Sequence, residues 1–133
     1  MTLTRIASVL PGDLEALVQK TIRCCIQVHR TLGPGMNERV YSLACGLELE
    51  AWRIAFERER TLPIRYRGKL LCHQRVDLFI EQRLVLEIKS VDAIHPVHIA
   101  QTVGYLRLTG ARVGLVVNFN VDVLKAGIRR VVL

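Results

Sequence analysis

At 133 residues the chain has the length of one domain, and it contains no repeat, low-complexity tract or linker. No apolar run approaches the ~20 residues needed to cross a bilayer, and the N-terminus lacks the apolar stretch of a signal peptide. The four cysteines follow neither zinc nor disulfide spacing. We therefore expect a single cytoplasmic domain over residues 1–133 without a membrane segment, in which residues 1–12 form a loose N-terminal arm.

The composition is basic, because 19 Lys and Arg residues stand against 12 Asp and Glu residues and give a formal net charge of +7. Most of these cations are arginines, whose guanidinium groups match the geometry of phosphate. The excess is compatible with a nucleic-acid partner. A solubilising surface charge explains the same numbers equally well.

Two helices are predicted first, on either side of a turn formed by Gly33, Pro34 and Gly35. Asp13 is a plausible N-cap for the first helix, in which apolar residues recur at helical spacing up to about residue 32. Asn37 is expected to cap the second helix, which should run to about residue 52. Its predicted buried stripe consists of Val40, Leu43, Ala44, Leu47 and Ala51.

From residue 56 the pattern changes to strands over residues 56–66, 70–80 and 84–89, separated by short turns. The last of these runs is apolar on both faces, which is typical of a central strand. A third helix is predicted over residues 96–109, and strands over 113–119 and 128–133 complete the chain. The order ααβββαβ with one extra strand predicts an α/β (α+β) fold with a mixed central sheet flanked by helices.

Glu87 and Lys89 are two residues apart on a predicted strand, so their side chains project from the same face. A carboxylate that holds a divalent cation, beside an ammonium group that activates the attacking water, suits a hydrolytic metal site. A Glu-x-Lys pair is common, however. Taken alone it is better explained as a surface ion pair at the end of a strand.

Asp77 strengthens the metal hypothesis, because it lies among apolar residues where a lone buried carboxylate would be costly. The short turn at Glu81 and Gln82 would place its strand antiparallel to the strand of Glu87. Both carboxylates could then converge on one Mg²⁺ or Mn²⁺ ion. The alternative is an ion pair between Asp77 and Arg75 or another cation.

Two helices carry further candidates. Glu38 and Tyr41, three residues apart, share a face of the second helix, although an acid in a first turn also favours the helix dipole without any function. On the third helix Gln101 and Tyr105 are four residues apart and form a polar stripe with His98. That stripe could line a cleft or simply face solvent.

The segment Gly35-x-x-Glu38-x-x-Tyr41 resembles the signature of small bacterial proteins known as the GxxExxY family. Residues 28–35, just before this signature, are similar to that family's N-terminal block, and later blocks are resembled in the same order at residues 87–91, 96–101, 105–110 and 114–119. The resemblance extends over roughly residues 14–133. It implies the restriction-endonuclease-like core of the PD-(D/E)XK nuclease superfamily, whose order is αβββαβ.

The resemblance also implies roles for individual residues. Glu38 resembles the acid of the superfamily's first helix, and Gln101 with Tyr105 resembles a helix motif of RecB-like members. Val76 stands where the motif's name has proline, a position that varies widely in the superfamily. The implied catalytic residues are Glu38, Asp77, Glu87, Lys89, Gln101 and Tyr105, and the implied metal ligands are Asp77, Glu87 and Glu38.

The leading hypothesis is a nuclease that hydrolyses phosphodiester bonds in DNA or RNA with Mg²⁺ or Mn²⁺. The alternative is a non-catalytic module that binds nucleic acid or protein on the same fold, and a cleavage assay separates the two. A redox or metal-cluster protein built on the cysteines is the weakest hypothesis, because their spacing fits no site. The chain leaves little room for a separate recognition domain, so specificity is expected to come from a partner or a homodimer.

Overall fold

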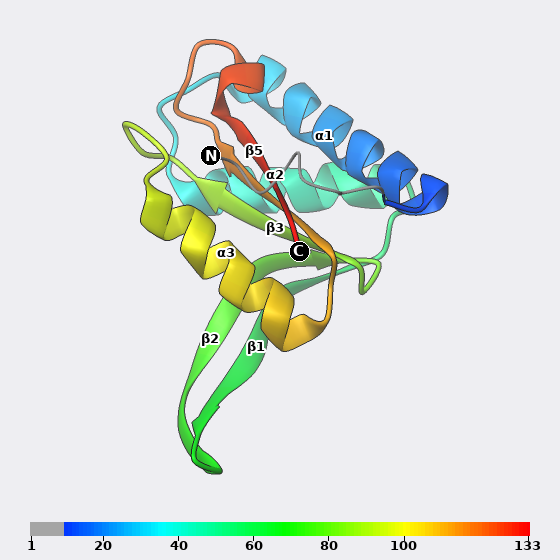
Figure 1. Cartoon of the computed structure of the whole chain (residues 1–133). Coiled ribbons are helices and arrows are strands. Elements are labelled where there is room, and N and C mark those ends of the chain that lie inside the picture. The colour runs from blue at the N-terminus through cyan, green and yellow to red at the C-terminus, as the bar shows by residue number, and fades with distance from the viewer. Residues whose placement is uncertain (1–9) are drawn as a thin grey trace.

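A five-stranded sheet with helices on both of its faces makes up residues 10–133, the part of the chain that the computed structural model describes (Figure 1). Its elements are, in chain order, α1 (Gly12–Leu32), α2 (Glu38–Ala51), β1 (Phe56–Tyr66), β2 (Lys69–Ile80), β3 (Leu84–Lys89), α3 (Pro96–Thr109), β4 (Val113–Asn118), the short 3-10 helix η2 (Leu124–Gly127) and β5 (Ile128–Val132). The predicted fold class and the predicted order of elements are therefore confirmed.

The sheet is mixed, with the strand order β1-β2-β3-β4-β5. β3 and β4 pair in parallel, and the other neighbours pair antiparallel. Glu81 and Gln82, both with left-handed φ angles of 52° and 57°, form the tight turn that joins β2 to β3. β3 and β4 lie in the middle and are buried almost throughout, which explains their continuous apolar runs.

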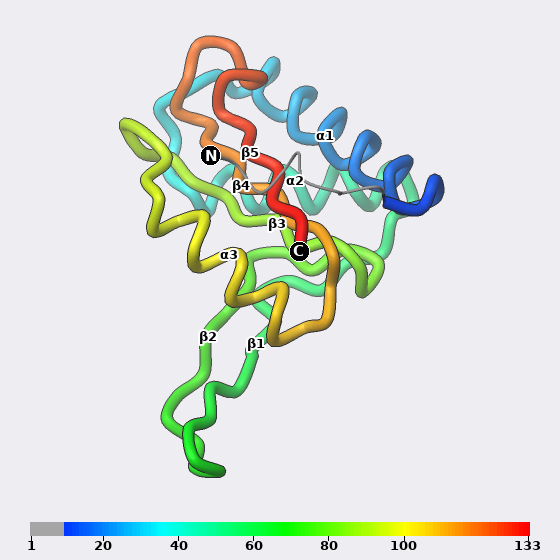
Figure 2. The backbone as a smooth tube through the Cα atoms, viewed as in Figure 1, coloured from blue at the N-terminus to red at the C-terminus, as the bar shows by residue number. Residues whose placement is uncertain are grey.

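The helices form two layers around the sheet (Figure 2). Leu84 and Leu86 of β3 belong to the core that the sheet makes with α1 and α2. Val85, which points the opposite way, belongs to the core beneath α3. A Cβ on Gly114 of β4 would lie 2.8 Å from the Cγ2 atom of Thr102, so the glycine lets α3 approach the sheet closely.

Asp13 is not the N-cap of α1, contrary to the sequence prediction. The helix begins one residue earlier, at Gly12, and no side chain caps it. The Asp13 carboxylate instead contacts the Arg83 guanidinium at 2.7 Å. Arg83 follows the β2–β3 turn, so the partner of Asp13 comes from a segment distant in sequence.

Asn37 does cap α2, as predicted, since its Oδ1 atom accepts a hydrogen bond from the Val40 N–H at 3.0 Å. The predicted buried stripe of α2 is largely wrong, because Leu43 and Leu47 are 43% and 68% exposed, although Ala44 does pack against the core. The buried residues of this helix are Tyr41, Cys45, Gly46 and Leu49. The helix carries two neighbouring apolar stripes, and its packing against α1 and the sheet selects the other one.

The N-terminal arm predicted over residues 1–12 lies mostly outside the described residues. Leu10 is buried in the core and Gly12 already belongs to α1, so the arm does not extend to residue 12. Within residues 10–133, no helix is both long enough and apolar enough to cross a membrane. The adjacent Cys24 and Cys25 are buried.

β1 and β2 continue beyond the rest of the sheet as a long hairpin (Figures 1 and 2). β2 pairs with β1 along nearly its whole length but with β3 only up to the Leu78–Leu86 pair. We call residues 60–76 of this hairpin the arm. The arm leaves the sheet at Asp77. Glu59 lies opposite Asp77 on β1, between residues that pair with β2, but it is not itself paired, and its φ of 54° is left-handed.

Candidate active site

Asp77 and Glu87 lie together where β2 and β3 diverge. The Asp77 backbone N–H donates a hydrogen bond to the Glu87 carboxylate at 2.9 Å. The Asp77 carboxylate in turn accepts a hydrogen bond from the Ile88 backbone N–H at 2.8 Å. The two side chains thus bind backbone groups of the opposite strand beyond the last ladder pair, and they satisfy donors that would otherwise lack a partner.

Burial raises the pKa of both carboxyl groups of this pair. Glu87 is 3% exposed, and burial raises its pKa to about 8, with a further contribution from the negative charge of Asp77. Burial likewise raises the pKa of Asp77, against the hydrogen bond from Ile88 and the positive charge of Lys89. A buried carboxylate and a half-buried neighbour cannot both ionise without a penalty, so the site favours either a bound proton or a cation.

The donor set of the pair fits a hard divalent cation. Each carboxylate uses one oxygen for its backbone hydrogen bond, and the other oxygen accepts none from residues 10–133. Neither of these remaining oxygens is fully enclosed, because the only enclosed side-chain atom without a partner in that range is the Thr21 hydroxyl. Mg²⁺ is commonly held by one or two carboxylates, with water and substrate phosphate completing its shell.

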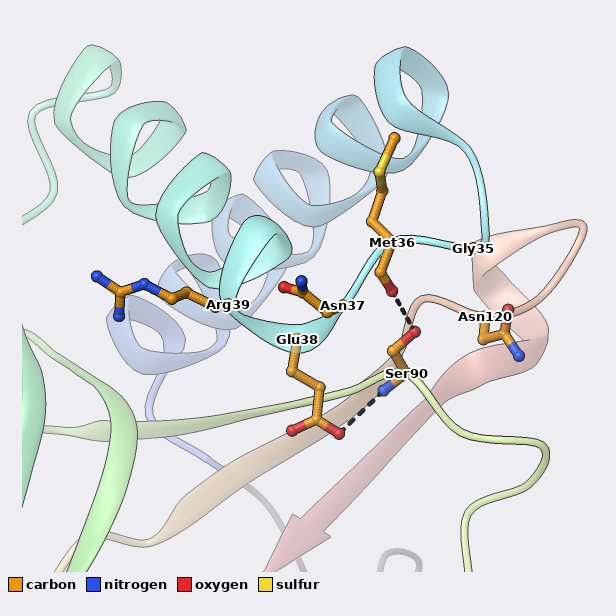
Figure 3. A pocket seen from close by; sticks show the side chains of 7 residues that line it. All are labelled: Gly35, Met36, Asn37, Glu38, Arg39, Ser90 and Asn120. Carbon is orange, nitrogen blue, oxygen red and sulfur yellow. Dashed lines mark hydrogen bonds between the residues drawn. The ribbon is translucent and has the colours of Figure 1, made fainter.

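Glu38 is the first residue of α2 and contacts the loop after β3; it lines the same pocket as Asp77. Its carboxylate accepts a hydrogen bond from the Ser90 N–H at 3.3 Å, and the Ser90 hydroxyl donates to the Met36 carbonyl at 2.6 Å (Figure 3). The negative charge of Glu38 contributes to the raised pKa of both Asp77 and Glu87. In the described part of the chain, however, no group of three or more His, Cys, Asp or Glu side chains is arranged to hold a metal ion. The structure therefore does not assemble Glu38 with the pair into one ligand set.

Tyr41 holds the loop that precedes Glu38. Its hydroxyl donates to the Gly33 carbonyl at 2.5 Å and accepts from the Met36 N–H at 3.1 Å. Its ring is fully buried and stacks on Phe119, with centroids 4.5 Å apart. The three residues of the Gly35-x-x-Glu38-x-x-Tyr41 motif thus have distinct structural parts. Gly35 belongs to the turn, Glu38 supplies a carboxylate near the site, and Tyr41 holds the turn in place.

Lys89 ends β3, is half-buried and projects from the same face as Glu87. Its positive charge lowers the pKa of both carboxylates. On α3, Tyr105 packs in the same core cluster as Val85 of β3, whose side chain lies on the face of Glu87. Burial raises the pKa of Tyr105 to about 12, and the charges of Glu87 and Asp77 add to the shift. The sheet and α3 therefore bring these four side chains to one site.

The polar stripe predicted on α3 is divided in the structure. Tyr105 is buried, whereas Gln101 is exposed and makes no side-chain hydrogen bond with any other residue in 10–133. His98 accepts a hydrogen bond through Nδ1 from the His95 N–H at 3.0 Å and so closes the first turn of the helix. Of the stripe, Tyr105 packs on the side of the Asp77–Glu87 pair, while burial and the positive charge of Lys89 lower the pKa of His98.

A pocket of about 180 Å³ opens beside Asp77. Its lining combines acids with two arginines and consists of Glu38, Arg39, Ser42, Leu43, Arg58, Glu59 and Asp77. Arg58 donates to the Ser42 hydroxyl at 2.6 Å and lies over Gly46, where a side chain would collide with it. A second, more open pocket of about 690 Å³ shares Glu38 and Arg39 with the first (Figure 3). Arg39 and Arg58 thus line the same pocket as Asp77 and Glu38.

Two buried residues that support the site carried no assigned role in the sequence. Asn118, at the end of β4, accepts from the Val91 N–H at 3.1 Å and donates to the Val91 carbonyl at 2.9 Å, so it fixes the loop that follows Lys89. The Nε2 atom of His29 lies 2.7 Å from the Val121 carbonyl and must carry the hydrogen, because a carbonyl only accepts. The sequence did contain a signal for Asn118, which is the one polar residue at the end of an otherwise apolar strand. It contained no signal for the hydrogen bond of His29, whose partner is 92 residues away.

Comparison with known proteins shows the family of the chain. A family model described as the PD-(D/E)XK nuclease superfamily matches residues 15–131. No curated protein and no solved structure matches the chain. The matched range runs from α1 to β5 and contains Glu38, Asp77, Glu87 and Lys89. The chain belongs to the PD-(D/E)XK nuclease superfamily.

Proposed function

We propose that this protein is a nuclease that hydrolyses phosphodiester bonds in DNA or RNA with Mg²⁺ or Mn²⁺ held at the Asp77–Glu87 pair. Membership of the superfamily supports nuclease activity and a nucleic-acid substrate. The observation that carries the proposal is the reciprocal hydrogen bonding that ties the buried Glu87 carboxylate and the half-buried Asp77 carboxylate to each other's strands. Such a pair is unfavourable when fully ionised and is relieved by a divalent cation.

The protein's own groups have separable roles in this proposal. Asp77 and Glu87 supply one free carboxylate oxygen each as ligands. When bound, the metal ion would polarise the phosphate and lower the pKa of a water molecule. Lys89 orients the attacking water and offsets the negative charge that develops on the phosphate. Arg58, in the adjoining pocket, is placed to contact a neighbouring phosphate oxygen.

The other candidate residues position these groups. Glu38 ties α2 to the loop after Lys89 through the Ser90 N–H, and it lies close enough to shape the field at the site. Tyr105 covers the pair from the α3 side, and Gln101 is assigned to substrate contact because it is exposed. Within the superfamily we assign the chain to the GxxExxY family. The assignment is based on the spacing of Gly35, Glu38 and Tyr41, and on the separate structural role of each of these residues.

A cleavage assay tests this proposal. Labelled single- and double-stranded DNA and RNA are incubated with the purified protein in Mg²⁺, Mn²⁺ or EDTA, beside Lys89→Ala and Lys125→Ala. Lys125 is an exposed lysine of η2, so its replacement removes the same charge away from the site. We expect metal-dependent cleavage by the wild type and Lys125→Ala, and a rate about 10²–10³ lower for Lys89→Ala. If the wild type binds nucleic acid but cuts nothing with either metal, a non-catalytic binding module replaces the nuclease.

A further inference from the structure

The arm concentrates the protein's positive charge. Residues 60–76 contain five Lys and Arg residues and no Asp or Glu, against a net charge of +7 for the whole chain. The rest of the chain is therefore nearly balanced. A segment of one sign that projects from the body (Figure 1) is suited to a polyanion and poorly suited to a neutral or basic partner.

The cations at the tip of the arm are free for such a partner. Nearer the sheet, Arg60 pairs with Glu57 at 3.3 Å and Arg75 pairs with Glu59 at 3.0 Å. Arg65, Arg67 and Lys69 at the tip are exposed and form no ion pair with any other residue between 10 and 133. Solvated cations of this kind contact phosphates at little cost, because they give up no existing ion pair.

The arm is continuous with the candidate active site. Asp77 lies on β2 at the point where the hairpin leaves the sheet, and Lys69 lies eight residues away along the same strand. At ~3.3 Å per residue in a strand, the tip is roughly 25 Å from the carboxylates. That length corresponds to about 7 base pairs of a duplex, which rise ~3.4 Å each. A nucleic acid held at the site can thus reach the tip.

The shape of the arm distinguishes between kinds of nucleic acid. Proteins that hold single strands stack successive bases on several aromatic side chains, and Tyr66 is the only aromatic residue in residues 60–76. A two-stranded β-ribbon instead fits the major groove of B-form DNA, which is about 12 Å wide. The major groove of A-form RNA is too deep and narrow for protein side chains to read.

We propose that the arm lies in the major groove of double-stranded DNA whose scissile phosphate lies at the proposed metal site of Asp77 and Glu87, with Arg65, Arg67 and Lys69 on phosphates of the groove walls. This inference rests on the proposed function, since it names the substrate of the same site. It also gives the chain a recognition element of its own, although it is a single domain. Tyr66, Leu70 and Leu71 of the arm, which are 66%, 48% and 62% exposed, would face base edges and thymine methyl groups.

The test compares two variants that lose the same charge. One replaces the tip cations (Arg65→Ala, Arg67→Ala, Lys69→Ala), and the other replaces three exposed cations of α1 (Lys20→Ala, Arg23→Ala, Arg30→Ala). Binding to a labelled 24-base-pair DNA duplex is measured by fluorescence anisotropy across a salt series in EDTA, so that cleavage does not interfere.

On the duplex, the tip variant should bind tenfold or more weakly, and its dependence of log K on log salt should be shallower by about 3. The α1 variant should keep most of the wild-type slope. The wild type should bind duplex DNA more tightly than single strands or double-stranded RNA of the same length, and the tip variant should lose this preference.

Several results would overturn the arm's assignment. They are equal losses of affinity in the tip and α1 variants, an unchanged salt slope in the tip variant, or tighter binding of single strands or double-stranded RNA by the wild type.

The apolar residues of the arm could instead bind a second copy of the chain. Light scattering that gives a dimer for the wild type but a monomer for Leu70→Ser, Leu71→Ser, with unchanged DNA binding, would show this. Binding is measured without metal, so the result for the arm does not depend on cleavage. A wild type that cuts nothing in the separate cleavage assay would contradict the proposed function but not the arm's role in binding.

Discussion

Asp77 and Glu87 each bind the backbone of the other's strand, through the Asp77 N–H on one side and the Ile88 N–H on the other. These two hydrogen bonds replace the β-ladder where β2 turns away into the arm. A carboxylate that accepts a backbone hydrogen bond keeps a fixed orientation, so both side chains are held in place before any metal arrives. A preorganised pair of this kind requires no reorganisation when a cation binds or when charge develops on a substrate.

The first prediction concerns stability against pH. The folded protein holds the proton of Glu87 more tightly than the unfolded chain does, because burial raises its pKa from 4.5 to about 8. The stabilisation is fully present below about pH 4.5 and is lost as the pH rises through about 8. In EDTA, the Tm of the wild type should therefore fall across this window relative to that of Glu87→Gln, whose amide still accepts from the Asp77 N–H.

A matched control is Glu50→Gln, which makes the same change at an exposed position of α2. It should follow the wild-type pH profile. Parallel profiles for the wild type and Glu87→Gln from pH 5 to 9 would mean that Glu87 is not held protonated by its surroundings.

The second prediction separates the two buried tyrosines. Tyr41→Phe removes the hydroxyl that bonds the Gly33 carbonyl and the Met36 N–H, so the free energy of unfolding should fall by about 1–3 kcal/mol. The Tyr105 hydroxyl has no hydrogen-bond partner within residues 10–133, so Tyr105→Phe should change stability by much less. Urea denaturation with equal m-values measures both. The anchor role of Tyr41 does not survive if the two variants are equally stable.

The third prediction concerns Gln101, which is exposed and makes no side-chain hydrogen bond in the described part of the chain. Gln101→Ala should slow cleavage and leave the Tm unchanged, because no packing or hydrogen bond is lost. Arg107→Ala, at another exposed position of α3, should leave the cleavage rate unchanged. A lower Tm for Gln101→Ala with an unaltered rate would make this glutamine structural.

Much of the fold could be predicted from local patterns. The strand of Glu87 is an apolar run because both of its faces are covered, and the short turn at Glu81 and Gln82 sufficed to place Asp77 beside it. The cap at Asn37 was also predictable, because it depends only on a hydrogen bond to a residue three positions away. Features that depend on neighbouring or nearby residues leave a signal in the sequence.

Features that depend on tertiary packing were missed. Asp13 pairs with Arg83, which is 70 residues away, and His29 bonds a carbonyl 92 residues away. The buried face of α2 was misassigned because two apolar stripes compete along it and only the packing of the helix selects one. The divergence of β2 and β3 likewise depends on the course of the arm, so sequence could bring Asp77 near Glu87 but could not predict their exchanged hydrogen bonds.

Anomalous scattering from crystals grown with Mn²⁺ tests the metal site most directly. The crystals should be held above pH 8, because a proton on Glu87 competes with the ion. We predict one anomalous peak roughly 2.1–2.2 Å from the free carboxylate oxygens of Asp77 and Glu87, and no peak there in crystals of Asp77→Asn. At saturating Mn²⁺, a wild-type crystal without density between these two carboxylates, or with its ion bound elsewhere, would contradict the assignment.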